Sequence, residues 1–174
     1  MEISEELIKK AETCVHYLKS VKKKIALAES CTGGLLSFLI TSIPGASDVL
    51  VCSLVTYTDN AKHKLLGISL EFLDTHGAVS NATAISMADS LIDRMPNVDL
   101  AISSTGFAGG RTTTEDSTFL EEENTGTVFI GCAKRHLESV AHRFTYGRHL
   151  MRSEIQKKAA ASALNIILQQ RWDE

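Results

Sequence analysis

The spacing of apolar residues divides the chain into alternating helices and strands. Leu7, Ala11, Val15 and Leu18 recur at helical spacing and predict a helix over residues 4–22. Further helices are predicted at 33–43, 60–67, 80–95 and 150–170. Short apolar or β-branched runs predict strands at 24–28, 49–58, 98–105, 126–134 and 138–146. A tight turn, "RHL", joins the last two strands and predicts an antiparallel hairpin.

The order of these elements indicates the class of fold. Strands alternate with helices, a hairpin follows, and a helix closes the chain. This order predicts an α/β fold, a three-layer α/β/α sandwich with a mixed, mostly parallel sheet of about five strands and one antiparallel member. In open sheets of this kind, ligands bind at the carboxyl ends of the strands. Those ends carry residues 29–34, 57–62 and 104–111 here.

Composition and charge argue against several classes of protein. The chain has 174 residues, 44% of them hydrophobic, which suits a single domain over residues 1–174. A net charge of −3 does not support a nucleic-acid partner. The charged N-terminus predicts no signal peptide, and no apolar run is long enough to span a bilayer, so no membrane partner is expected. The four scattered cysteines argue against a disulfide framework or a zinc site and favour a reducing cytoplasm.

The first strand end, "AESCTGG", combines hydroxyls, a thiol and two glycines. The hydroxyl of Ser30 would lie near backbone amides at the positive end of a helix dipole, and Gly33 and Gly34 would let a ligand approach the backbone. An ordinary alternative is that Ser30 or Thr32 simply caps the helix. Cys31 is a rival nucleophile, because a helix N-terminus lowers a thiol pKa. The ordinary alternative is that Cys31 is a small buried residue.

The other two strand ends each have a functional and an ordinary interpretation. In "TYTDNAKHK", Lys62 could act as a general base only if its pKa is lowered, and otherwise it is a solvated surface residue. Tyr57 could act beside Lys62, or it could simply be a half-buried packing residue. In "SSTGFAGG", the glycines would leave amides free for a developing oxyanion, or the segment is a flexible loop.

Considered together, the three segments predict a nucleophilic site. A hydroxyl at a helix N-terminus, a lysine and a tyrosine can form a Ser–Lys–Tyr site, with glycine amides as oxyanion donors. The histidines have no evident acid partner, and metal-ligand spacing such as His-x-x-x-His is absent, so we expect no metal.

Several motifs in order along the chain resemble one family. They are "AESCTGG" (28–34), "PGAS" (44–47), "TYTDNAKHKLLG" (56–67), "HGAVS" (76–80), "STG" followed by "AG" (104–109), "GTVFIG" (126–131) and, more loosely, "FTYGRHLMR" (144–152). The chain resembles the C-terminal domain of the competence/damage-inducible protein CinA, including its stand-alone forms, the PncC-type nicotinamide-nucleotide amidohydrolases.

The resemblance implies a reaction and roles for individual residues. It implies deamidation of nicotinamide mononucleotide, a small-molecule nucleotide, to nicotinate mononucleotide and ammonia, without metal or cofactor. It also implies a homo-oligomer, a dimer. Ser30 would be the nucleophile, Lys62 its base and Tyr57 a further catalytic residue. The implied substrate-binding residues are Thr32, Gly33, Gly34, Thr105, Gly106 and Arg148, with amides near Gly33 or Gly106 holding the oxyanion.

Two departures from the family pattern keep a second hypothesis open. Tyr146-Gly147 stands where the family usually has Gly-Asp before the arginine that matches Arg148. The loop over residues 111–125 is longer than usual and acidic, and carboxylates near the mouth of a site would repel a phosphate. The alternative is a non-catalytic nucleotide-binding or regulatory module with the same fold.

Overall fold

A computed structural model describes residues 2–109 and 123–172. Its helices are α1 (Glu5–Ser20), α2 (Leu35–Thr41), α3 (Asp59–Leu66), α4 (Leu70–His76), α5 (Asn81–Arg94) and α7 (Arg152–Gln169), with a short 3₁₀ helix, η1 (Ala46–Asp48). Its strands are β1 (Ile25–Glu29), β2 (Leu50–Val55), β3 (Leu100–Gly106), β4 (Thr127–Lys134) and β5 (Val140–Thr145). Within these two ranges, no helix has the length and apolarity needed to cross a membrane.

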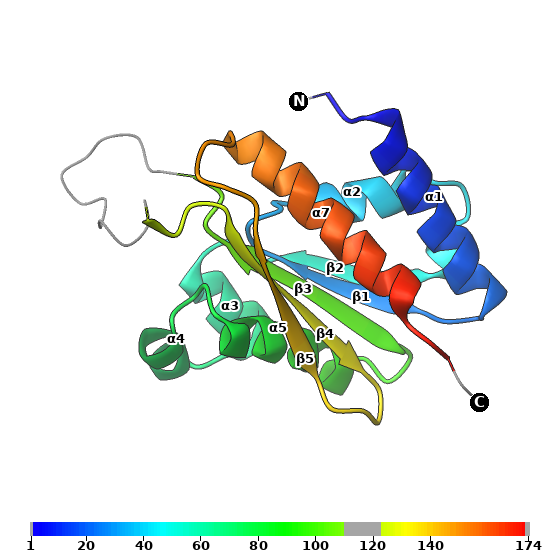
Figure 1. Ribbon diagram of the computed structural model, residues 1–174. Coiled ribbons are helices and arrows are strands. Elements are labelled where there is room, and N and C mark those ends of the chain that lie inside the picture. Colours follow the sequence, from blue (N-terminus) through cyan, green and yellow to red (C-terminus); the bar gives the residue numbers. More distant parts are fainter. Residues whose placement is uncertain (1, 110–122, 173–174) are drawn as a thin grey trace.

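The strands form one mixed sheet in the order β2-β1-β3-β4-β5 (Figure 1). Strand β1 lies parallel to both β2 and β3, whereas β4 is antiparallel to β3 and to β5. Strand β4 therefore runs against the other four, and β4 and β5 form the predicted hairpin. The prediction of a mostly parallel sheet with one antiparallel member is confirmed.

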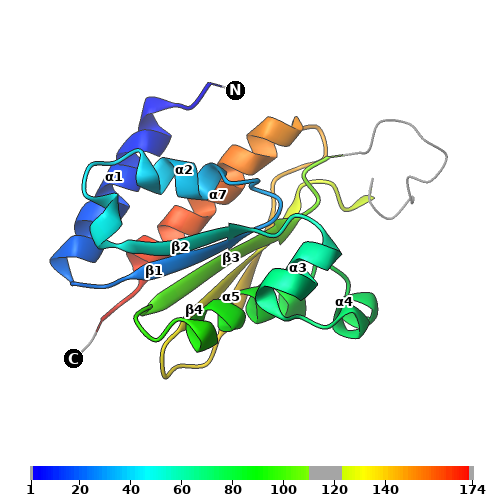
Figure 2. The same ribbon diagram turned by 180° about the vertical axis from the view of Figure 1, so that it is seen from behind.

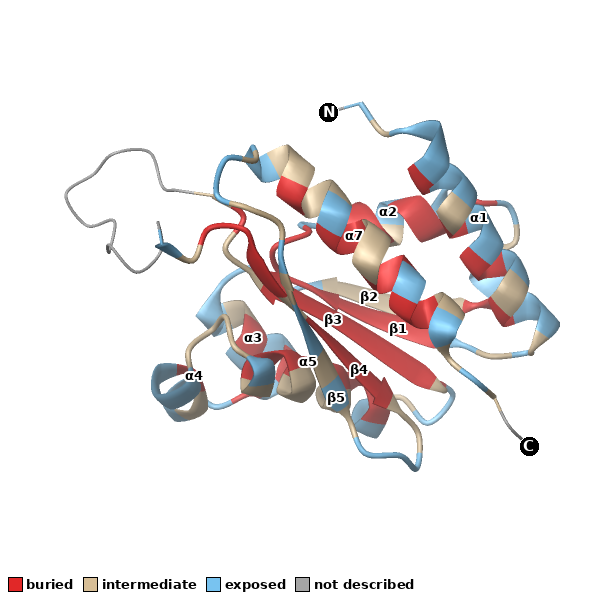
Figure 3. Ribbon diagram, in the orientation of Figure 1, coloured by how far each residue is buried: buried red, intermediate tan, exposed pale blue. Residues whose placement is uncertain are grey.

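Helices cover both faces of the sheet. Helices α1, α2 and α7 lie on one face and α3, α4 and α5 on the other (Figures 1 and 2). Alternate residues of β1 contribute to the two cores: Leu27 packs with the first set of helices and Ala26 with the second. The central strands β1, β3 and β4 are buried between the helices in Figure 3, whereas the edge strands β2 and β5 are more exposed. This arrangement confirms the three-layer sandwich.

Two elements differ from the prediction for local physical reasons. Helix α4 is absent from the predicted elements because only Leu73 of its seven residues is buried, so it carries no apolar stripe. Helix α2 begins at Leu35 instead of residue 33. Gly33 and Gly34 have φ of 62° and 95°, a left-handed conformation that ends the turn before the helix can start. Ser30 therefore lies before this turn and outside α2.

Candidate active site

Three strand ends meet at a cleft of about 570 Å³. They are the turn after β1, the link from β2 to α3 and the end of β3, which are the three segments predicted to carry ligand chemistry. The segment before α5 and the first residue of α7 complete the wall. The lining consists of Ser30, Cys31, residues 57–59, Lys62, residues 77–79, residues 105–109 and Arg152.

A buried carboxylate, and not a hydroxyl, caps the helix after β1. Glu29 is 1% exposed. Its Oε2 accepts hydrogen bonds from the amides of Gly34 and Leu36, both at 3.0 Å, and its Oε1 accepts one from the amide of Ser37 at 2.8 Å. These are amides that a helix N-terminus otherwise leaves without partners. Because Glu29 provides the cap, the simple capping interpretation of Ser30 is wrong.

The amine of Lys62 reaches the hydroxyl of Ser30 inside the cleft. Lys62 lies in α3, whose first turn is capped by Thr58, and its side chain is fully buried. Its Nζ lies 3.2 Å from Ser30 Oγ and donates to the carbonyl of Thr56 at 3.1 Å. The carboxylate of Asp59 lies 4.0 Å from the same nitrogen. The structure therefore excludes the solvated-surface interpretation of Lys62.

Burial lowers the pKa of Lys62, because the ammonium loses its hydration. The charge of Asp59 opposes this shift but is a smaller effect. Lys62 thus releases its proton more easily than a solvated lysine does. In the neutral amine, one hydrogen can stay on the carbonyl of Thr56 while the lone pair accepts the proton of Ser30. This arrangement is the one that a general base requires.

The rival nucleophile, Cys31, is held in its protonated form. Its side chain is buried, and burial raises the thiol pKa to about 12, outweighing the hydrogen bond with Ser104 that lowers it. The position near a helix N-terminus does not compensate, because Glu29 already occupies the amides of that terminus. The structure favours the buried structural role for Cys31.

An arginine that sequence analysis missed lies at the mouth of the cleft. Arg152 donates to the hydroxyl of Tyr57 at 3.2 Å and to the carbonyl of Gly109 at 2.6 Å. Tyr57 is 56% exposed, and this contact directs its hydroxyl toward Arg152. Arg148, the arginine selected by resemblance, is exposed and does not line the cleft. The signal for Arg152 was its place at the end of the motif "FTYGRHLMR".

Thr105 and Gly106 line the cleft, whereas Thr32 does not. Thr105 is buried, and its hydroxyl donates to the carbonyl of Ala78 at 2.7 Å, which joins the end of β3 to the opposite wall. A Cβ on Gly106 would lie 2.7 Å from the Val128 side chain, so the pairing of β3 with β4 requires glycine there. The hydroxyl of Thr32 shares a hydrogen bond of 2.7 Å with Ser104.

The backbone amides of the turn after Ser30 differ in whether they reach the cleft. The amide of Gly33 donates to the carbonyl of Ser30 at 3.1 Å, and that of Gly34 donates to the capping carboxylate. Neither glycine lines the cleft, so they form the turn and are not the oxyanion donors expected near Gly33. By contrast, Cys31 lines the cleft directly after Ser30, so its amide is the candidate oxyanion donor of this turn.

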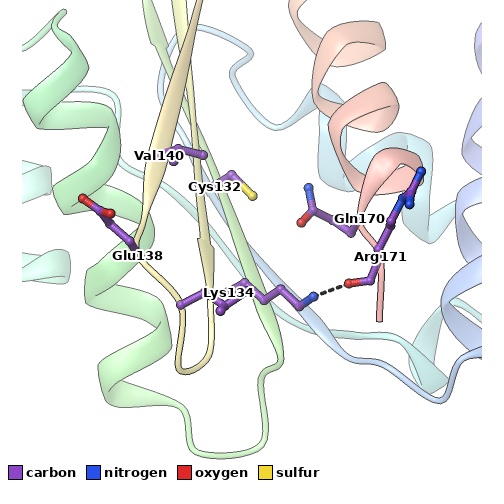
Figure 4. A pocket seen from close by; sticks show the side chains of 7 residues that line it. Cys132, Lys134, Glu138, Val140, Gln170 and Arg171 are labelled. Carbon is purple, nitrogen blue, oxygen red and sulfur yellow. Dashed lines mark hydrogen bonds between the residues drawn. The ribbon is translucent and has the colours of Figure 1, made fainter. Parts of the chain in front are cut away.

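A second hollow, of about 480 Å³, lies away from the carboxyl ends of β1, β2 and β3, between the β4–β5 hairpin and the end of α7 (Figure 4). Its Lys134 donates to the carbonyl of Arg171 and lies 4.3 Å from the centroid of the Trp172 ring. Burial raises the pKa of its Cys132 thiol to about 11. An engaged amine and a protonated thiol do not form a nucleophile–base pair, so the cleft at the strand ends is the candidate active site.

The acidic loop predicted over residues 111–125 lies, as far as residue 122, outside the described residues. Its relation to the cleft stays a prediction.

Comparison with known proteins identifies the family of this α/β domain. The model of the CinA C-terminal domain matches residues 7–171, and the chain belongs to that family. The CinA-like protein of Thermotoga maritima is 36% identical over 145 residues, which are 83% of this chain and 34% of that protein. A putative competence-damage inducible protein of Caldicellulosiruptor bescii is 39% identical over 154 residues, 88% of this chain and 36% of that protein. The chain thus spans about a third of the length of these relatives.

Solved structures share the fold over nearly the whole chain. The competence/damage inducible protein CihA of Agrobacterium tumefaciens has a TM-score of 0.84 and 30% identity, covering 97% of this chain and 98% of that one. The competence damage-inducible protein A of Klebsiella pneumoniae has a TM-score of 0.83, covering 96% and 99% of the two chains. Its identity of 23% supports the fold alone.

Proposed function

We propose that this chain is an amidohydrolase that converts nicotinamide mononucleotide to nicotinate mononucleotide and ammonia. The observation that carries the proposal is the buried Lys62, whose Nζ lies 3.2 Å from Ser30 Oγ in a cleft at the strand ends. A buried lysine with no role would be destabilising, because the ammonium loses hydration that its neighbours replace only in part. The burial of Lys62 is explained if this residue serves as the base for Ser30.

In the proposed reaction, Ser30 Oγ attacks the carboxamide carbon while neutral Lys62 accepts the hydroxyl proton. The amide of Cys31 stabilises the negative charge that develops on the carboxamide oxygen. The carbon–nitrogen bond then breaks, and Lys62 returns the proton to the leaving nitrogen, which departs as ammonia. An ester of Ser30 remains.

Water completes the cycle by the same route. Lys62 accepts a proton from the attacking water, the ester bond to Ser30 breaks, and Ser30 regains its proton. The product is nicotinate mononucleotide.

The charge of Arg152 supports a substrate with an anionic tail. Its guanidinium lies at the mouth of the cleft and forms no ion pair with a carboxylate among the described residues. A phosphate could replace the neutral contacts with Tyr57 and Gly109 by charge-assisted hydrogen bonds. The four free thiols also agree with the reducing cytoplasm that we expect for this enzyme.

The experiment is to incubate the purified chain with nicotinamide mononucleotide and measure ammonia and nicotinate mononucleotide separately. We expect the two products in equal amounts, and neither from the Ser30→Ala variant. Binding of nicotinamide mononucleotide without release of ammonia would reject the enzyme and leave the non-catalytic nucleotide-binding module as the better account.

A further inference from the structure

The cleft contains a carboxylate that the proposed reaction does not use. Asp59 occupies the first position of α3 and lines the cleft. Its Oδ1 lies 4.0 Å from Lys62 Nζ, and its side chain is 57% exposed. Among the described residues, Lys62 is the partner of its single ion pair. The cap of α3 is the hydroxyl of Thr58, which accepts from the amide of Ala61, so Asp59 is not needed for capping.

A carboxylate in the first turn of a helix has an ordinary explanation, which is interaction with the helix dipole. That interaction does not require the carboxylate to face a cleft or to approach a catalytic amine. Asp59 even works against the general base, since its charge raises the pKa of Lys62 while burial lowers it. A cation bound in the cleft would reverse this disadvantage by offsetting the charge of Asp59.

The distances place Asp59 within range of the acyl group of a substrate. Ser30 Oγ and Asp59 Oδ1 both lie close to Lys62 Nζ, at 3.2 Å and 4.0 Å. They are therefore at most about 7 Å apart. An aromatic ring that presents its carboxamide to Ser30 and extends toward Asp59 would lie inside this range, where the field of a single carboxylate is still strong.

We infer that Asp59 selects substrates whose carboxamide is carried on a positively charged ring. The inference rests on the proposed function and names the substrate class of the same site. Among the described residues that line the cleft, the other ionisable groups are Cys31, Tyr57, Lys62 and Arg152, so Asp59 is the carboxylate of this part of the chain that offers a cationic ring its counter-charge. With Arg152 at the mouth, the cleft complements a ligand that is cationic at the acyl group and anionic at the tail.

The test compares two ligands that differ in ring charge. Nicotinamide mononucleotide has a cationic ring, and its reduced dihydro form has the same carboxamide, ribose and phosphate on a neutral ring. Dissociation constants are measured by calorimetry on Ser30→Ala protein, which cannot turn the ligand over. We expect the cationic form to bind roughly two- to five-fold more tightly, the range that a partly exposed charge pair contributes.

A second substitution assigns that preference to Asp59. Adding Asp59→Asn should bring the two dissociation constants together, while Asp59→Glu should keep most of the difference. Arg152→Gln is the matched control and should weaken both ligands by the same factor. The preference should also shrink as salt rises and screens the charges. Circular dichroism checks that each variant is folded.

Each outcome bears on one claim. Equal binding of the two ligands to Ser30→Ala protein, or a preference that survives Asp59→Asn, would overturn the inference even if the enzyme releases ammonia. A preference that depends on Asp59 in a protein that releases no ammonia would support the inference and reject the hydrolase. If neither ligand binds, both the inference and the proposed substrate are wrong.

Discussion

Replacing Glu29 by Gln tests whether this carboxylate organises the turn that presents Ser30. The substitution keeps the size of the side chain and removes its charge. One oxygen becomes an NH₂ group. If the remaining oxygen takes the place of Oε2, the amides of Gly34 and Leu36 keep an acceptor, but the NH₂ group then faces the amide of Ser37, which donates to Oε1 at 2.8 Å. In the opposite orientation of the side-chain amide, the NH₂ group faces two backbone amides, those of Gly34 and Leu36, instead of one.

The magnitude follows from these contacts. A hydrogen bond to a charged group contributes about 1.5–3 kcal/mol, and a buried donor left without a partner costs about 1–3 kcal/mol. Since Glu29 is 1% exposed, water cannot replace the lost acceptor. We expect Glu29→Gln to lower the free energy of unfolding by about 2–4 kcal/mol. For a protein of this size, that change lowers the melting temperature by roughly 5–15 °C.

The assay is thermal unfolding followed by circular dichroism, with ammonia release measured well below the transition. We expect at least a tenfold loss of kcat as well, because the amides that shape the Ser30 turn lose their common acceptor. Glu71→Gln is the matched control: Glu71 is an exposed glutamate in the first turn of α4 and should change stability by less than about 0.5 kcal/mol. An unchanged melting temperature for Glu29→Gln would refute the capping role.

Three further predictions concern the groups beside Ser30. Lys62→Met should reduce kcat about 10² to 10⁴-fold with a smaller change in KM, because a general base acts in the transition state. In the unmodified enzyme, kcat/KM should rise with pH as Lys62 loses its proton and level off below the ordinary lysine pKa of 10.5. A Lys62→Met enzyme of normal rate would contradict the assignment of the base. Iodoacetamide should modify Cys31 slowly near neutral pH, since burial raises its thiol pKa to about 12; rapid alkylation mapped to Cys31 would show an activated thiol.

The apolar pattern predicts the three layers because strand β1 is apolar on both faces. Leu27 and Ala26 point into different cores, and a short, wholly apolar run indicates a strand covered on both sides. The same argument fails for α4, where a single buried residue, Leu73, leaves no helical periodicity to detect.

The site could be predicted only in part, because its contacts join distant positions. Ser30 and Lys62 are 32 residues apart in sequence. Their approach depends on the parallel pairing of β1 with β2, which ends at Glu29 and Val55. The pattern around Lys62 alone is that of a surface helix, and its burial appears only in three dimensions. The role of Glu29 is hidden for a different reason: its closest partners are backbone amides, and these leave no side-chain signal.

The central claim is that Ser30, and not the neighbouring Cys31, attacks the carboxamide. The most direct test measures the rate of ammonia release from nicotinamide mononucleotide by two variants side by side, Ser30→Ala and Cys31→Ala, each shown to be folded by its melting temperature. We expect Ser30→Ala to have no detectable activity and Cys31→Ala to keep a substantial part of the normal kcat. An inactive Cys31→Ala together with an active Ser30→Ala would contradict the central claim.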